Sequence, residues 1–159
     1  IYKELGANAV IVRPFNIVGP GMPLTDSRVF PAFASSILKG EPLKVYGDGR
    51  QTRTFCDIED AIVGFLTALV LGNPAEVYHV GNPECELSML GLAELFTRET
   101  RRFNKHLEVQ QVQSPGVYVG EPTRRCPDIS KLAKLGYRPE VPLSASIANY
   151  LQWAHDQWP

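Results

Sequence analysis

The stretch "VIVRPFNIVGPGM", residues 10–22, decides the fold. An uninterrupted apolar run over residues 9–12 leads into it, and such a run is typical of a parallel-sheet strand covered on both faces. Pro14 should end the strand, because proline has no N–H for a sheet ladder. The glycines and prolines that follow predict a loop over residues 16–28.

A strand of this kind needs parallel neighbours and covering helices, yet the following hundred residues show no repeated strand–helix–strand pattern. We therefore expect the neighbouring strands to lie upstream of residue 1. The chain also begins with isoleucine rather than methionine, and we expect it to be a segment of a longer protein.

Hydrophobic periodicity predicts short strands and helices in the rest of the chain. Strands are expected over residues 43–46, 52–55, 77–80 and 107–112, and helices over 29–38, 58–71, 90–103, 129–135 and 144–158. The helix 58–71 is apolar nearly all round, which predicts that it is buried.

Composition narrows the function classes. The 159 residues include 16 basic and 17 acidic side chains, a balance of −1 that argues against nucleic acid as a partner. No apolar run is long enough for a membrane span, and no signal peptide is evident. Three widely spaced cysteines predict neither a disulfide framework nor a metal site, which makes a reducing cytoplasm the expected location.

Two acidic residues at the start of the helix 58–71 could be mistaken for a catalytic pair. Asp57 and Asp60 are three residues apart where a helix should begin, and carboxylates there favour the positive helix end. We interpret both as capping residues. The three histidines show no metal-ligand spacing.

Four blocks in order resemble the extended short-chain dehydrogenase/reductase family, especially its nucleotide-sugar epimerases, 4,6-dehydratases and UDP-glucuronate decarboxylases. They are "RPFNIVGPGM", "VFPAFASSILKGEPLKVYGDGRQTRTFCDIEDAIVGFL", "VYHVGNPE" and "RRCPDISKLAKLGYRPEVPL", and the resemblance covers essentially the whole chain. It implies an α/β fold, the C-terminal part of a Rossmann-type doubly wound sheet plus a small mixed α/β substrate-binding domain. Residues 1–22 would be the last element of the incomplete dinucleotide-binding domain, and 23–159 the substrate domain, with room for later elements to return to the Rossmann sheet.

Two motifs of that family have no counterpart here, the glycine-rich cofactor turn and the catalytic Tyr-x-x-x-Lys pair. The nearest pattern, Tyr46 with Arg50, lies in a predicted turn. The resemblance therefore implies no catalytic residue in this chain. It implies a nucleotide-diphosphate sugar as ligand, NAD or NADP bound mainly by the missing N-terminal half, and a homodimer of the full-length enzyme.

Arg53, in "GDGRQTRTF", is the foremost candidate for the substrate diphosphate, because guanidinium donors suit phosphate oxygens. The alternative is a surface ion pair with Asp48 or Asp57, and we interpret Arg50 as a solvated neighbour. By the resemblance, Asn16 also touches the diphosphate; on spacing alone, the favoured interpretation is a residue that caps the turn to Gly19.

The remaining candidates also rest on the resemblance. Pro14 and Phe15 would lie against the nicotinamide end of the cofactor. A set around the nucleobase comprises Val29, Phe30, Lys44, Val45 and Tyr46. The alternative for Val45 and Phe30 is that they are core residues, the commoner fate of such side chains. Alternation in the strand puts Lys44 and Tyr46 on the face opposite Val45.

Near the C-terminus, the stretch "GEPTRRCPD" supplies the last candidates. Glu121 would accept from ribose hydroxyls, and Arg125 or Arg124 would add a second phosphate contact. The alternative is a solvated basic pair. A non-catalytic nucleotide-binding module of the same fold is the second functional hypothesis, and the sequence leaves the sugar, the base and the type of reaction open.

Overall fold

The computed structural model describes residues 4–6, 8–100, 107–113 and 122–157. The elements in chain order are β1 (Ile11–Pro14), β2 (Ile17–Val18), α1 (Val29–Lys39), β3 (Leu43–Tyr46), β4 (Thr52–Thr54), β5 (Cys56–Asp57), α2 (Ile58–Leu71), β6 (Val77–Val80), a 3₁₀ turn η1 (Pro83–Cys85), β7 (Glu86–Ser88), α3 (Met89–Thr100), β8 (Val109–Val112), β9 (Arg124–Arg125), α4 (Ser130–Ala133) and α5 (Leu143–Gln157). The helix over 58–71 has the predicted bounds. Helix α1 ends at Lys39, and Gly40, whose φ is 72°, is its C-cap.

Strand β1 has a neighbour inside the chain, which corrects the expectation that its neighbours lie only upstream. It pairs in parallel with β6, from Ile11 opposite Val77 to Pro14 opposite Val80. Pro14 is the last residue of the strand, so the strand includes Pro14 and does not stop before it. The N–H groups of Ile11 and Phe15 donate across the pair, so the missing N–H of Pro14 points away from β6.

Helix α2 connects these two strands and packs on them through small residues. The buried face carries Ala61, Gly64 and Ala68, and a Cβ added at Gly64 would lie 2.8 Å from Cγ1 of Val80. The opposite face is exposed, so the prediction of an all-round buried helix is wrong. Periodicity showed that the helix is apolar, but not which faces are covered. The exposed apolar side chains are those of Ile62, Val63, Leu66, Leu69, Val70 and Leu71.

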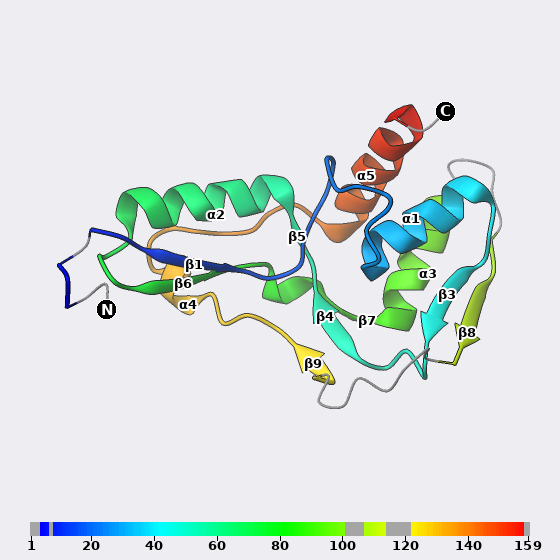
Figure 1. Ribbon diagram of the computed structural model, residues 1–159, viewed down its shortest axis with the longest axis horizontal. Helices are drawn as coiled ribbons and strands as arrows, with labels where there is room; N and C mark the ends of the chain where they lie inside the picture. Colours follow the sequence, from blue (N-terminus) through cyan, green and yellow to red (C-terminus); the bar gives the residue numbers. More distant parts are fainter. Residues whose placement is uncertain (1–3, 7, 101–106, 114–121, 158–159) are drawn as a thin grey trace.

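Two hydrophobic cores lie at opposite ends of the molecule (Figure 1). One joins β1, β6, α2 and α4, and the other joins α1, α3 and α5 with β3. Strands β4, β5, β7 and β9 lie between them. The expected domain boundary at residue 22 stays a prediction; α2, β6 and α4, all beyond it, pack together with β1.

A buried carboxylate links the start of α2 to the segment that leads into α5. Both oxygens of Asp60 accept backbone N–H groups, from Glu140 and from Val141, each at 3.0 Å. Asp57 caps α2 by accepting from the N–H of Glu59 at 2.9 Å. The interpretation of Asp57 as a capping residue is therefore confirmed. Asp60 also has a structural role, but its carboxylate accepts from the backbone of Glu140 and Val141 and does not cap α2.

Candidate functional site

The three-stranded sheet between the two cores carries the basic candidates. Its strand order is β7-β4-β9, with β4 antiparallel to β7 and parallel to β9. Arg53 is in register with Arg125, and Thr52 is in register with Arg124. Because in-register neighbours project from the same face and successive residues from opposite faces, the four side chains divide into two pairs. Arg53 and Arg125 share one face; Thr52 and Arg124 share the other.

Arg53 is held close to the sheet. The residue is 9% exposed, and its Nη1 donates to the carbonyl of Thr52 at 2.8 Å. Arg125, its neighbour on the edge strand, is exposed. A guanidinium carries five N–H donors, so two adjacent arginines can serve several oxygens of one anion. Arg50 is exposed, in agreement with its interpretation as the solvated neighbour.

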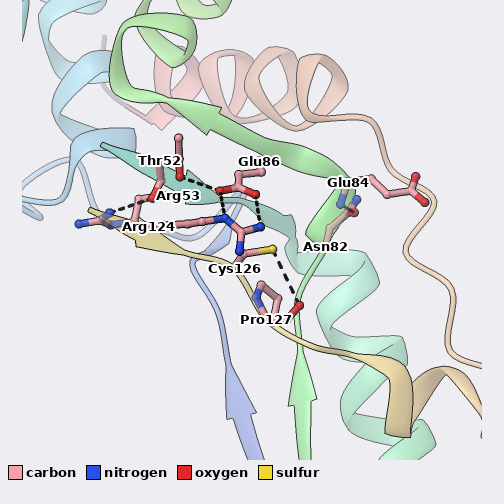
Figure 2. Close-up of polar contacts among 8 residues, drawn as sticks. All are labelled: Thr52, Arg53, Asn82, Glu84, Glu86, Arg124, Cys126 and Pro127. Carbon is pink, nitrogen blue, oxygen red and sulfur yellow. Dashed lines mark hydrogen bonds and ion pairs between the residues drawn. The ribbon is translucent and has the colours of Figure 1, made fainter. Parts of the chain in front are cut away.

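The opposite face of the sheet holds a group that we call the Glu86 cluster: Thr52, Glu86 and Arg124 (Figure 2). The carboxylate of Glu86 accepts from Oγ1 of Thr52 at 2.6 Å and from Nε and Nη2 of Arg124 at 2.9 and 2.7 Å. The bidentate bond to Arg124, followed by the bond from Thr52, lowers the pKa of Glu86. Figure 2 shows the guanidinium of Arg124 against Glu86 and that of Arg53 pointing the other way.

This arrangement places the two arginines that the sequence left open on different faces of the sheet. Arg124 is committed to Glu86 on the face away from Arg53. Arg125 lies on the same face as Arg53, so the structure brings together Arg53 and Arg125. Their contact with a ligand stays a prediction.

Asn16 lies where the segment leaving β1 meets β4. Its φ is 40°, a left-handed conformation that asparagine tolerates better than most residues. Its amide nitrogen donates to the carbonyl of Thr54 at 2.8 Å, and its own carbonyl accepts from the N–H of Cys56 at 3.1 Å. The side chain therefore attaches to the residue that follows Arg53, instead of capping the turn to Gly19. Asn16 and Arg53 therefore come from adjacent segments, and their contact with a diphosphate stays a prediction.

Pro14 and Phe15 lie at the carboxyl end of β1, the edge at which ligands bind in open α/β sheets. The ring of Phe15 is half-buried and lies 5.1 Å, centroid to centroid, from the ring of His79. The backbone approaches closely here, since a Cβ at Gly81 would lie 3.1 Å from Cβ of Phe15. A contact with the cofactor stays a prediction.

The five residues predicted around the nucleobase are divided between core and surface. Phe30 and Val45 are each 1% exposed and lie in the core formed by α1, α3, α5 and β3. There the ring of Phe30 packs edge-on against that of Phe96, with 4.9 Å between the ring centroids. Only the backbone groups of Phe30 and Val45 are left for a ligand. Val29 is partly buried against the same core. Lys44 and Tyr46 are exposed on the other face of β3, as the alternation predicted.

The remaining observations concern Glu121, the cysteines, and the features that a metal site or a membrane span would need. Glu121 lies outside the described residues, so its predicted contact with ribose is unplaced. The described cysteines are free thiols, and burial raises the pKa of Cys56 to about 12. In the described part of the chain, no three His, Cys, Asp or Glu side chains gather as a metal site would need. No helix among the described residues has the length and apolarity to cross a membrane.

Sequence reasoning missed the Glu86 cluster altogether. Glu86 is 34 residues from Thr52 and 38 from Arg124, and no short motif connects them. Only the pairing of β7, β4 and β9 brings the three side chains together.

Comparison with known proteins places the fold in a family. A model of the NAD dependent epimerase/dehydratase family matches residues 1–81. UDP-glucuronic acid decarboxylase 3 of Arabidopsis thaliana is 36% identical over 147 residues, which are 92% of this chain and 41% of that protein. UDP-D-apiose/UDP-D-xylose synthase of Oryza sativa subsp. japonica is 33% identical over 173 residues, covering 96% of this chain and 43% of that protein.

Solved structures agree with this placement. The UDP-glucuronic acid 4-epimerase of Bacillus cereus, in complex with UDP-glucuronic acid and NAD, superposes with a TM-score of 0.82 at 28% identity, over 99% of this chain and 48% of that one. The chain thus spans less than half the length of each of these proteins. By the family match over residues 1–81 and the shared fold, the chain belongs to the NAD-dependent epimerase/dehydratase family of extended short-chain dehydrogenases/reductases.

Proposed function

We propose that this chain is the substrate-binding part of an NAD(P)-dependent nucleotide-diphosphate-sugar epimerase, dehydratase or decarboxylase. The observation that carries the proposal is the pair Arg53 and Arg125, in register on one face of β4 and β9. Neighbouring strands lie about 4.8 Å apart, a spacing that suits two guanidinium groups on the two linked phosphates of a diphosphate.

The identity of the relatives favours a uridine nucleotide. The Arabidopsis and rice relatives are named for UDP-sugars, and the Bacillus epimerase binds UDP-glucuronic acid. For this chain we propose that Asn16 assists at the diphosphate and that Glu121 takes the ribose. Backbone groups of Val29, Phe30 and Val45, with Lys44 and Tyr46, would border the base.

NAD or NADP fits one part of the described structure. The half-buried ring of Phe15 offers an apolar surface at the carboxyl end of β1, suited to a nicotinamide, and Pro14 lies beside it. When bound, the cofactor supplies hydride transfer. We propose that groups outside this chain bind most of it and provide the reacting tyrosine and lysine, since no Tyr-x-x-x-Lys occurs in the sequence. The role of this chain is to hold the nucleotide so that the sugar is oriented, which lowers the barrier by making the reaction effectively intramolecular.

Two exposed surfaces support completion of the sheet by further residues. Strand β1 has β6 as its one strand neighbour among the described residues, and Ile11 on it is 37% exposed. On α2, Leu69 and Val70 are 70% and 74% exposed. Apolar surface of this extent is normally covered. We propose that the rest of a Rossmann domain packs here, that the complete enzyme is a homodimer, measurable by light scattering, and that it works in the cytoplasm, measurable by cell fractionation.

The test is UDP binding by isothermal titration calorimetry, on the complete protein encoded by the gene. Arg53→Ala should weaken UDP binding at least about tenfold, because a lost charge-assisted bond costs about 1.4 kcal/mol or more. Arg125→Ala should act in the same direction. The matched control is Arg50→Ala, which removes an exposed arginine three residues away and should change affinity little. Equal affinity in the wild type and Arg53→Ala would refute the proposal.

A further inference from the structure

We propose that Glu86 is a positioning residue for the diphosphate site: it holds β9 against β4 from the back of the sheet and thereby keeps Arg125 beside Arg53. This inference rests on the proposed function. It assigns a role in binding to a side chain on the opposite face from the ligand.

The geometry makes Glu86 the link across the whole width of the sheet. Glu86 lies on β7, one edge of the strand order β7-β4-β9, while Arg124 lies on β9, the other edge. A single carboxylate reaches Thr52 on the central strand and Arg124 beyond it, through three bonds of 2.6 to 2.9 Å. The side chain of Glu86 is 23% exposed, and that of Arg124 is 67% exposed.

Strand β9 is short and is paired with β4 at two positions, Thr52 with Arg124 and Arg53 with Arg125. It is two residues long, and a backbone bond from Thr52 N–H to Thr123 O, at 2.8 Å, marks its start. Arg125 follows Arg124 directly, so a shift of Arg124 by one residue would turn Arg125 to the opposite face of the sheet. Holding Arg124 therefore fixes the side on which Arg125 projects.

Simple charge effects predict the opposite result from positioning, which makes the inference testable. A carboxylate near a bound diphosphate repels it, so removing the charge of Glu86 should strengthen UDP binding by Coulomb's law alone. If Glu86 acts by placing Arg125, its removal should weaken UDP binding. The direction of the change in UDP affinity therefore distinguishes charge repulsion from positioning.

The experiment is UDP calorimetry on the complete protein with Glu86→Ala and Glu86→Gln. We expect about threefold to tenfold weaker binding for Glu86→Ala, a smaller loss than for Arg53→Ala because Glu86 acts through Arg125 and not on the ligand itself. Glu86→Gln, which keeps an acceptor but loses the charge, should fall in between. The control is Glu84→Ala, which removes the same charge from an exposed glutamate that Figure 2 shows apart from the cluster, and should not weaken UDP binding.

A double-mutant cycle separates positioning from general destabilisation. If Glu86 works through Arg125, then Arg125→Ala should cost less in the Glu86→Ala background than in the wild type. A general loss of stability would leave the two effects additive. Arg124→Ala removes the other half of the ion pair. Charge and positioning both predict weaker binding for this variant, so its double-mutant cycle with Arg125→Ala, and not the sign of its effect, serves in place of any Glu86 variant that fails to fold.

The outcomes distinguish this inference from the proposed function. A wild-type protein without UDP affinity would refute both. Wild-type binding that is weakened by Arg53→Ala, but unchanged or strengthened by Glu86→Ala, would overturn the role of Glu86 and leave the proposed function standing. Additive effects of Glu86→Ala and Arg125→Ala would overturn it as well.

Discussion

Asp60 should be among the most costly single residues to remove. Its two carboxylate oxygens accept the N–H groups of Glu140 and Val141 at 3.0 Å each, and the residue is 6% exposed. Asp60→Ala would leave both N–H groups without their acceptor, at about 1–3 kcal/mol each. We expect a loss of about 3 kcal/mol in the free energy of unfolding, which corresponds to a fall in Tm of about 6–12 °C for a domain of this size.

Asp60→Asn sharpens the test, because the new amide can accept from one N–H but would turn its own N–H toward the other. We therefore expect it to lose at least half of what Asp60→Ala loses. The control is Glu59→Ala, an exposed carboxylate in the same first turn, which should cost under about 1 kcal/mol through the helix dipole alone. Urea denaturation of the complete protein, followed by circular dichroism, measures all three. The reasoning is refuted if Asp60→Ala costs no more than Glu59→Ala.

Three other predictions follow from buried or paired groups. Cys56, whose pKa burial raises to about 12, should resist iodoacetamide at neutral pH in the folded protein and react after unfolding; mass spectrometry showing rapid labelling of the native state would contradict this. Gly49→Ala should destabilise by about 1–3 kcal/mol in urea denaturation, because φ is +65° and the new Cβ would lie 2.6 Å from Val45 and 2.8 Å from Leu90; an unchanged midpoint would be inconsistent with this packing. The pKa of Glu86 is lower in the folded than in the unfolded state, so its stabilising effect is complete at neutral pH and is lost as the pH falls through the folded value. The stability difference between the wild type and Glu86→Gln should therefore shrink in acid, and a difference that grows would show the opposite linkage.

Local signals predicted the elements that depend on local chemistry. Asp57 caps α2, and the bounds of the helix came out as expected. The alternation of β3 was also readable, since Lys44 and Tyr46 project to the face opposite Val45.

Features that depend on long-range pairing could not be read in this way. The partner of β1 is β6, more than sixty residues on, and the helix that joins them follows several elements of the other core. The periodicity of α2 showed that the helix is apolar. It could not show that neighbouring elements cover only one of its faces. That Arg125, and not Arg124, shares a face with Arg53 follows only from the register of a two-residue strand.

A crystal structure of the complete protein with UDP tests the central claim most directly. We predict phosphate oxygens at about 3 Å from the guanidinium groups of both Arg53 and Arg125, with Arg124 still bound to Glu86 on the far face. A diphosphate bound away from Arg53, or a guanidinium of Arg53 turned from the nucleotide, would contradict the claim.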